Sequence, residues 1–249
     1  MNYKAVLDIN VYHQMIASLS ILALLGVFYY DAGLSALFNI LGCIVFTGIL
    51  DVIGKYLKMK RIIFPKTGMI SGMLIGGILS PTSSIAQLAL ACLMAMLSKH
   101  AVRLWNRNVF NPATFGILSS IVVLGASPAW WIASNAYAVA ILGFLILAKL
   151  SKYSVFISFL LAMLVALVLT GVASANLVNI ITTQFIIFFA MFMLTEPRTS
   201  AYKDLGVILY GGIVGLISGA LFLAMPSAFL FIALLTGNVA SLALNKLKV

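Results

Sequence analysis

Long apolar segments separated by short polar connections fill this sequence and restrict what it can fold into. Of its 249 residues, 63% are hydrophobic and 8% are charged, whereas about a quarter of the residues of a soluble domain are charged. The composition therefore excludes a soluble enzyme, a nucleic-acid-binding domain and a disordered chain, and it predicts an all-α polytopic membrane protein. Ten segments are found, at about residues 11–30, 34–57, 67–80, 83–101, 113–126, 129–150, 153–173, 176–195, 205–225 and 227–245.

The basic residues predict how these segments are oriented. A transmembrane helix needs about 20 residues, so ten of them form a single membrane domain over residues 1–249. If residue 1 lies in the cytoplasm, all 15 lysines and arginines fall at cytoplasmic ends or connections. The positive-inside rule favours this arrangement, so we expect a multi-pass protein of the cell (inner) membrane with both termini cytoplasmic. Trp105, Trp130 and Trp131 lie in or beside connections, where aromatic residues anchor helices in the interface.

The ten segments divide into two groups of five. Because five is odd, the second group enters the membrane from the opposite side and is inverted relative to the first. Proline positions agree with this division: Pro81 and Pro197 follow the third and eighth segments, and Pro112 and Pro226 open the fifth and tenth. The sequence therefore predicts two inverted repeats, at about residues 11–126 and 129–245.

Two segments at corresponding positions of the repeats are predicted to be discontinuous. The third has about 14 uncharged residues, which cover about 21 Å of a hydrocarbon core that is roughly 30 Å thick. The first half of the eighth is polar and contains Asn176, Asn179, Thr182, Thr183 and Gln184. Discontinuous helices in both repeats point to a binding site near the midplane. The alternative is that the polar residues of the eighth segment lie among the lipid headgroups.

Asp51 and Glu196 are the acidic residues nearest to the predicted hydrocarbon core. Lys55 follows Asp51 by one helical turn and is expected to neutralise it. Glu196 lies in Thr195-Glu196-Pro197, where the proline ends a helix and frees backbone carbonyls. Carboxylate and carbonyl oxygens bind small hard cations, so Thr195 and Glu196 are the predicted ion site. No metal site is predicted, because the two histidines and two cysteines lack metal-ligand spacing.

Glycines recur every fourth residue along the third and ninth segments. They are Gly68, Gly72 and Gly76, and Gly211, Gly215 and Gly219. Such a stripe lets another helix, or a flat ligand, approach the backbone closely. Close helix packing is the preferred interpretation, and a ligand slot at Gly72 and Gly76 is the alternative.

Three short motifs give the chain a family resemblance. They are Ser98-Lys99-His100, Phe110-Asn111-Pro112-Ala113 and Thr195-Glu196-Pro197. In this order and spacing, over about residues 10–225, the sequence resembles the NqrB/RnfD family. Members are membrane subunits of the sodium-translocating NADH:quinone reductase and of the Rnf electron-transport complex. The resemblance implies ten helices in two inverted five-helix repeats, similar to the fold of urea transporters.

The resemblance also implies a flavin, FMN or riboflavin, or a quinone within the bundle. Relatives with covalent FMN carry it on the threonine of a Ser-Gly-Ala-Thr motif, which does not occur in this sequence. We therefore expect any flavin to be non-covalent. The residues expected to hold it are Lys99, Asn111, Pro112, Thr82, Gly72, Gly76, Thr182 and Gln184.

These features favour a membrane electron-transfer subunit that couples redox chemistry to cation translocation and is not catalytic alone. No nicotinamide-binding glycine motif occurs, so the electron donor is expected to bind other membrane or peripheral subunits. The basic loop at 58–66 is the expected docking site, or it contacts anionic lipid. No nucleic-acid partner is expected. The alternative function is a channel or transporter for a small solute or flavin, built on the same fold.

Overall fold

The computed structural model describes residues 3–29, 33–104, 107–201 and 204–245. Within them the protein is all-α apart from one pair of two-residue antiparallel strands, β1 (Arg103–Leu104) and β2 (Arg107–Asn108). Each of the ten predicted segments contains a helix, which confirms the all-α class. The α-helices are α1 (Tyr3–Tyr29), α2 (Gly33–Met59), α3 (Lys66–Ile78), α4 (Ile85–Ala101), α5 (Pro112–Leu124), α6 (Ala136–Leu150), α7 (Tyr153–Leu169), α8 (Ser174–Ile181), α9 (Gln184–Phe188), α10 (Asp204–Leu221) and α11 (Phe229–Leu244).

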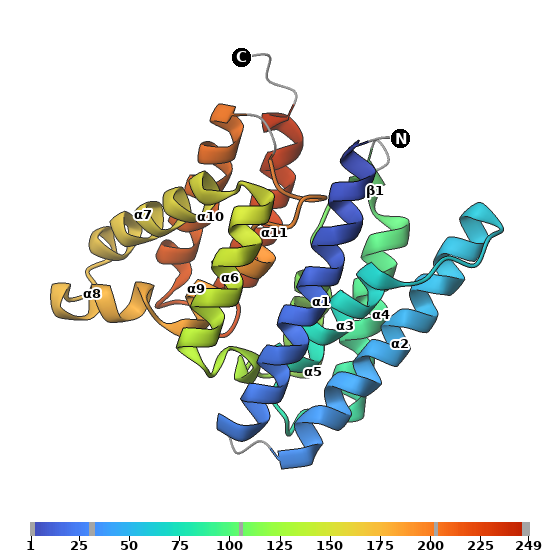
Figure 1. Cartoon of the computed structure of the whole chain (residues 1–249). Helices are drawn as coiled ribbons and strands as arrows, with labels where there is room; N and C mark the ends of the chain where they lie inside the picture. The colour runs from blue at the N-terminus through green and yellow to red at the C-terminus, as the bar shows by residue number, and fades with distance from the viewer. Residues whose placement is uncertain (1–2, 30–32, 105–106, 202–203, 246–249) are drawn as a thin grey trace.

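The helices form two groups that meet along α1. In Figure 1, α1–α5 lie on one side and α6–α11 on the other, and α1 contacts α3 of the first group and α6 of the second. Helix α1 begins and α11 ends at the same end of the bundle (Figure 1). A chain that crosses a membrane an even number of times has both ends on the same side, so this arrangement agrees with an even number of crossings. Lys203, Lys246 and Lys248, which contribute to the predicted charge bias, and Trp105 lie outside the described residues.

Two helices are long and apolar enough to cross a membrane among the residues that the structure describes. They are α1, over Val11–Phe28, and α2. A third crossing results if the bent pair Ser174–Ile181 and Gln184–Met193 counts as one span. Six further apolar helices have 10–17 residues. The length and composition of these helices support a membrane protein.

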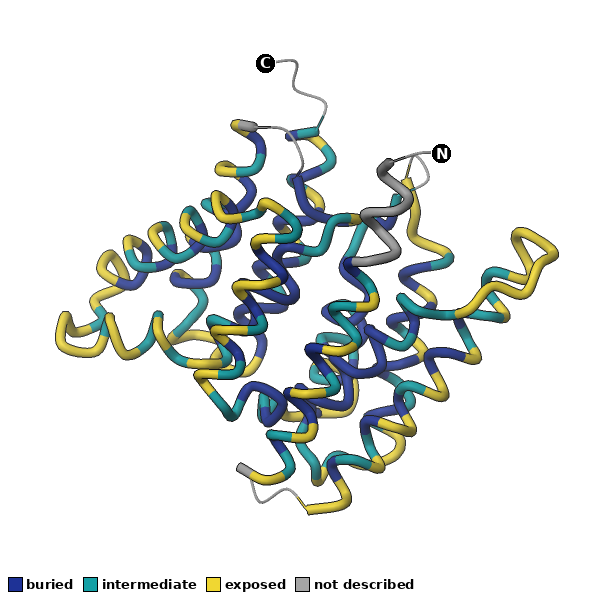
Figure 2. The backbone as a smooth tube through the Cα atoms, in the orientation of Figure 1, coloured by how far each residue is buried: buried dark blue, intermediate teal, exposed yellow. Residues whose placement is uncertain are grey.

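The outer surface is apolar, unlike that of a soluble domain. Most exposed positions on α7 are apolar, including Ile157, Leu161 and Val165, and Figure 2 shows exposed positions along the outer helices. Polar side chains, by contrast, are buried in the interior, as Asn111 and Asn238 are. A large exposed apolar surface is unfavourable in water, whereas lipid makes it the expected outer surface.

The glycine stripes serve helix packing. A Cβ at Gly72 would lie 2.5 Å from Thr47 Oγ1 and 2.6 Å from the Cys43 carbonyl oxygen of α2, and one at Gly76 would lie 2.7 Å from Ile40 Cα. In the second group, a Cβ at Gly215 of α10 would lie 2.3 Å from the Phe159 carbonyl oxygen of α7. The packing interpretation is confirmed, and neighbouring backbone fills the slot that a flat ligand at Gly72 and Gly76 would need.

Replacing Gly215 with alanine should therefore destabilise the protein, by about 1–3 kcal/mol, because the new methyl group overpacks the α7–α10 interface. Gly212 on the same helix is the matched control, since a Cβ there meets nothing within 4 Å. Gly212→Ala should be neutral or stabilising by up to about 1 kcal/mol. Thermal unfolding in detergent measures both variants, and equal melting temperatures would contradict the packing argument.

The eighth segment is broken, as predicted, whereas the third forms one short continuous helix. Helix α3 has 13 residues and ends at Ile78, and the residue that caps it, Leu79, pairs with Pro128 in an isolated bridge. The eighth segment consists of α8, α9 and the π-helix η2 (Phe189–Met193), with a bend of 48° between α8 and the rest. Between them, Trp131 is fully buried and donates from Nε1 to the Gly76 carbonyl oxygen at 3.0 Å. The prediction that Trp131 anchors in the interface is therefore wrong, because its ring packs in the core.

Candidate functional site

A small pocket lies inside the bundle where α3 and α5 begin and η2 ends. Most of its lining is apolar, and we call it the polar pocket for the polar side chains it contains, which are Tyr12, Thr67, Ser71, Asn111, Thr195 and Glu196. Apolar residues of α1, α6 and η2 close the pocket. Its volume is about 40 Å³, and a buried water occupies about 10–15 Å³ on this measure. The pocket therefore has room for two or three waters or one small cation, and it is too small for a flavin ring.

Asn111 connects the two motifs that flank this pocket. Its Oδ1 accepts a hydrogen bond from the Thr114 backbone N at 3.0 Å and so caps α5, while Pro112 occupies the first turn. Its Nδ2 donates to the Met193 carbonyl oxygen at 3.4 Å. The Asn111 backbone N donates to Asn238 Oδ1 at 2.8 Å. The side chain thus joins the start of α5 to the end of η2.

The segment after η2 is held by side chains from other elements. The Met193 carbonyl cannot accept from Pro197, which has no N–H, and accepts instead from the Glu196 backbone N at 3.4 Å and from Asn111. The Leu194 carbonyl accepts from the Tyr210 hydroxyl at 3.3 Å, and the Pro197 carbonyl accepts from Arg107 at 3.1 Å. The Met193 and Leu194 carbonyls thus already accept hydrogen bonds, and the ion site at Thr195 and Glu196 stays a prediction.

Glu196 supplies the carboxylate of this pocket in the described part of the chain. The Thr199 hydroxyl donates to Glu196 Oε2 at 3.3 Å. Burial raises the pKa of Glu196 to about 7, although Arg198 and Lys99 oppose this rise. Thr195 is buried and donates to the Met191 carbonyl oxygen at 2.7 Å, which leaves its lone pairs as acceptors. Carboxylate and hydroxyl oxygens thus remain as possible ligands of a small cation.

A buried ionic cluster lies next to the polar pocket. Asp51 is fully buried, and its carboxylate contacts Lys55 at 2.7 Å, Lys99 at 2.8 Å and His100 at 3.0 Å. The predicted pair with Lys55 is confirmed. The contact with Lys99 was not predicted, because α2 and α4 are far apart in sequence. Lys99 also donates to Thr67 Oγ1 at 2.7 Å, so its ammonium is engaged by protein groups rather than placed at a flavin site.

The residues expected to hold a flavin do not form one site. Asn111 and Pro112 line the polar pocket, while Lys99 lies in the ionic cluster. Thr82 is exposed in a turn, where its hydroxyl lies 2.8 Å from Ser80 Oγ. Thr182 is exposed and donates to the Val178 carbonyl oxygen at 2.7 Å. The hydroxyl groups of these two threonines thus bond to residues close to them in sequence.

Gln184 lines a separate pocket of about 510 Å³ at the opposite end of the bundle. Trp130 and Phe185 supply its aromatic walls, with ring centroids 5.7 Å apart, and Ser127 and Ser134 add hydroxyl groups. Trp130 is supported by Phe231, which stacks on it at 5.4 Å. Flat heterocycles bind such pockets through ring stacking and a few polar contacts. Trp130 was predicted to anchor a helix in the interface, and this pocket around it was not predicted.

Comparison of the chain with protein-family models and with curated proteins finds no match. Among the described residues, no three histidine, cysteine, aspartate or glutamate side chains are grouped so as to hold a metal ion. The candidate functional site consists of three features: the polar pocket, the ionic cluster beside it and the aromatic pocket at the other end of the bundle.

Proposed function

We propose that the protein is the membrane subunit of an Rnf-like or Nqr-like electron-transport complex and couples electron transfer to cation movement. The observation that carries this proposal is the meeting of two sequence motifs at one pocket. Asn111 of Phe-Asn-Pro-Ala bonds to the turn that leads into Thr195-Glu196-Pro197, and both motifs line the polar pocket. The pocket has the size and the oxygen atoms for a small cation.

The aromatic pocket is the better place for the non-covalent flavin, or for a quinone. Trp130 and Phe185 provide ring faces, and Gln184, Ser127 and Ser134 provide hydrogen-bonding groups. A bound flavin would supply one- or two-electron redox chemistry, and these side chains would bind and orient its ring. Of the residues first expected at this site, Gln184 alone lines the pocket in the described part of the chain.

The proposed topology has ten spans in two inverted repeats. Support comes from the short α3 and the broken α8–η2 at corresponding positions, and from α1 and α11, whose outer ends lie at one end of the bundle (Figure 1). Reporter fusions after Val249 and within the 58–66 loop should give a cytoplasmic signal, and a fusion after Pro128 an external one. An external signal after Val249 would contradict the proposed number of spans.

The rival function is a channel or transporter for a small solute. It is favoured by one observation, the position of the polar pocket. Thr67 and Tyr12 line both this pocket and a wide basic cleft at the end of the bundle, so polar surface continues from the cleft inward. Discontinuous helices around a central site serve permeation as readily as ion coupling.

An absorption spectrum of the purified protein separates the two functions. Flavin bands in near-stoichiometric amount support the redox subunit, and Trp130→Ala should lower the flavin content. A colourless protein that makes liposomes permeable to a solute supports the transporter.

Because the Ser-Gly-Ala-Thr motif is absent, flavin should leave the chain on denaturation. A fluorescent band at 26.7 kDa on a denaturing gel, after co-expression with a flavin transferase, would contradict non-covalent binding.

A further inference from the structure

A cleft of about 800 Å³ opens where α2 and α4 end, at the end of the molecule that the charge pattern assigns to the cytoplasm. Its lining carries six cationic side chains, those of Lys55, Lys58, Lys66, Lys99, Arg103 and Arg198. Asp51 pairs with Lys55 and Lys99, and the whole sequence has 15 lysines and arginines against five acidic residues. The cleft therefore contains a large excess of positive charge.

Several of these cations are held in place by the protein itself. The Lys58 ammonium donates to the His100 carbonyl oxygen, and Arg198 Nε donates to the Tyr12 hydroxyl at 3.0 Å. Fixed like charges repel one another, and an anion in the cleft would offset this repulsion. The guanidinium groups of Arg103 and Arg198 have the planar geometry that matches phosphate oxygens.

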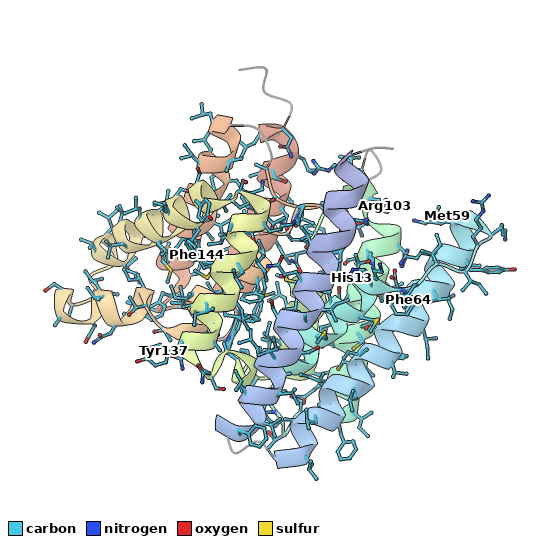
Figure 3. All side chains as sticks on the ribbon, in the orientation of Figure 1. His13, Met59, Phe64, Arg103, Tyr137 and Phe144 are labelled. Carbon is cyan, nitrogen blue, oxygen red and sulfur yellow. The ribbon has the colours of Figure 1, made fainter. Side chains whose placement is uncertain are left out.

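The rim of the same cleft is apolar and faces outward. Phe64 is 64% exposed and Met59 57% exposed, and Ile63 lies beside them in the lining. Figure 3 labels Met59 at the end of α2, Phe64 in the loop that follows it and Arg103 near β1. A free phosphate or a nucleotide has no hydrocarbon chain to contact this apolar rim. A ligand with both a phosphate group and hydrocarbon chains can contact the cations and the rim together.

We infer that this cleft binds the phosphate group of an anionic phospholipid. Lys58, Arg103 and Arg198 contact the phosphate, and Ile63 and Phe64 contact the first part of the acyl chains. Basic pockets between transmembrane helices on the cytoplasmic side have the chemistry for such headgroups. The inference does not depend on the proposed redox function, since the cleft lies apart from the aromatic pocket.

The test is lipid titration of the purified full-length protein followed by native mass spectrometry. Phosphatidylglycerol should bind in preference to phosphatidylcholine. The double variant Lys58→Gln/Arg103→Gln should bind phosphatidylglycerol roughly thirtyfold more weakly, about fivefold for each basic side chain removed. The matched control is Lys60→Gln/Arg61→Gln, which removes two charges from the adjoining exposed loop outside the cleft lining. It should change binding less than about twofold.

The outcomes separate the cleft from general surface charge and from soluble phosphate. Equal loss of phosphatidylglycerol in both double variants would overturn the inference, because surface charge alone would then explain binding. Calorimetric titration with inorganic phosphate is the second arm. Cleft-dependent phosphate binding without any preference for phosphatidylglycerol would also overturn it. Melting temperatures of both variants show whether each is folded.

Discussion

Replacing Asp51 with asparagine is expected to lower the free energy of unfolding by about 3–5 kcal/mol. The Asp51 side chain is fully buried between Lys55, Lys99 and His100. Asparagine removes the negative charge and leaves Lys99, which is 5% exposed, without a counter-ion. An unpaired buried charge is costly because the protein interior solvates it poorly. Thermal unfolding of the purified variant in detergent measures the loss.

Two further variants distinguish this mechanism from a general loss of packing. Lys55 is 19% exposed, so Lys55→Gln should cost no more than about 1 kcal/mol. Asp51→Asn combined with Lys99→Met should recover much of the lost stability, because the unpaired charge is gone. If Asp51→Asn melted at the wild-type temperature, the ionic cluster would not contribute to stability.

The second large effect is expected at Glu196. If the proposed function is right, then in vesicles containing the proposed electron-transport complex Glu196→Gln should reduce coupled cation uptake at least about tenfold, because it removes a charge-assisted contact worth roughly 1.5–3 kcal/mol. Thr199→Ala is the control, since it removes the hydrogen bond to Glu196 Oε2 and keeps the carboxylate. Uptake that is unchanged in Glu196→Gln, at matched expression, would exclude Glu196 as the cation ligand.

The pH dependence of stability provides an independent measurement on the same carboxyl group. Its pKa is raised from 4.5 to about 7 in the folded protein. The folded state therefore binds the proton more tightly than the unfolded chain, and the Glu196 contribution to stability is lost as pH rises through about 7. Between about pH 8 and pH 5, the melting temperature of the wild type should rise more than that of Glu196→Gln. Identical pH profiles would contradict the raised pKa.

The helical segments could be predicted because apolar composition determines them locally. The short α3 and the break in the eighth segment also follow from local sequence, from the length of the uncharged run and the polar residues before Gln184. The π-helix η2 was not predicted, and neither were the side chains that bond to the carbonyls at its end, Asn111 to Met193 and Tyr210 to Leu194, because both come from distant parts of the sequence. Local propensity contains no information on such distant partners.

The candidate site could be predicted only in part, because some of its residues are brought together by helices that are distant in sequence. Glu196 and Asn111 lie in motifs that were identified from sequence, and the structure places both at one pocket. Lys99 was assigned to a flavin, because the sequence did not show that α2 would bring Asp51 to its ammonium. The aromatic pocket was missed because Trp130 and Phe185 come from different segments.

The hydrogen bonds around Asn111 limit how the two helix groups can move. Asn111 of α5 bonds to Asn238 of α11, Asn238 Nδ2 donates to the Tyr210 hydroxyl of α10, and Tyr210 donates to the Leu194 carbonyl oxygen. Two bonds of Asn111 cross between the groups, from its backbone N to Asn238 Oδ1 and from its Nδ2 to the Met193 carbonyl oxygen. Rocking of one group against the other would break both, and each unpaired buried group costs about 1–3 kcal/mol. We therefore expect access to the polar pocket to change through α1 and the start of α3, because the α5–η2 side carries both of these bonds.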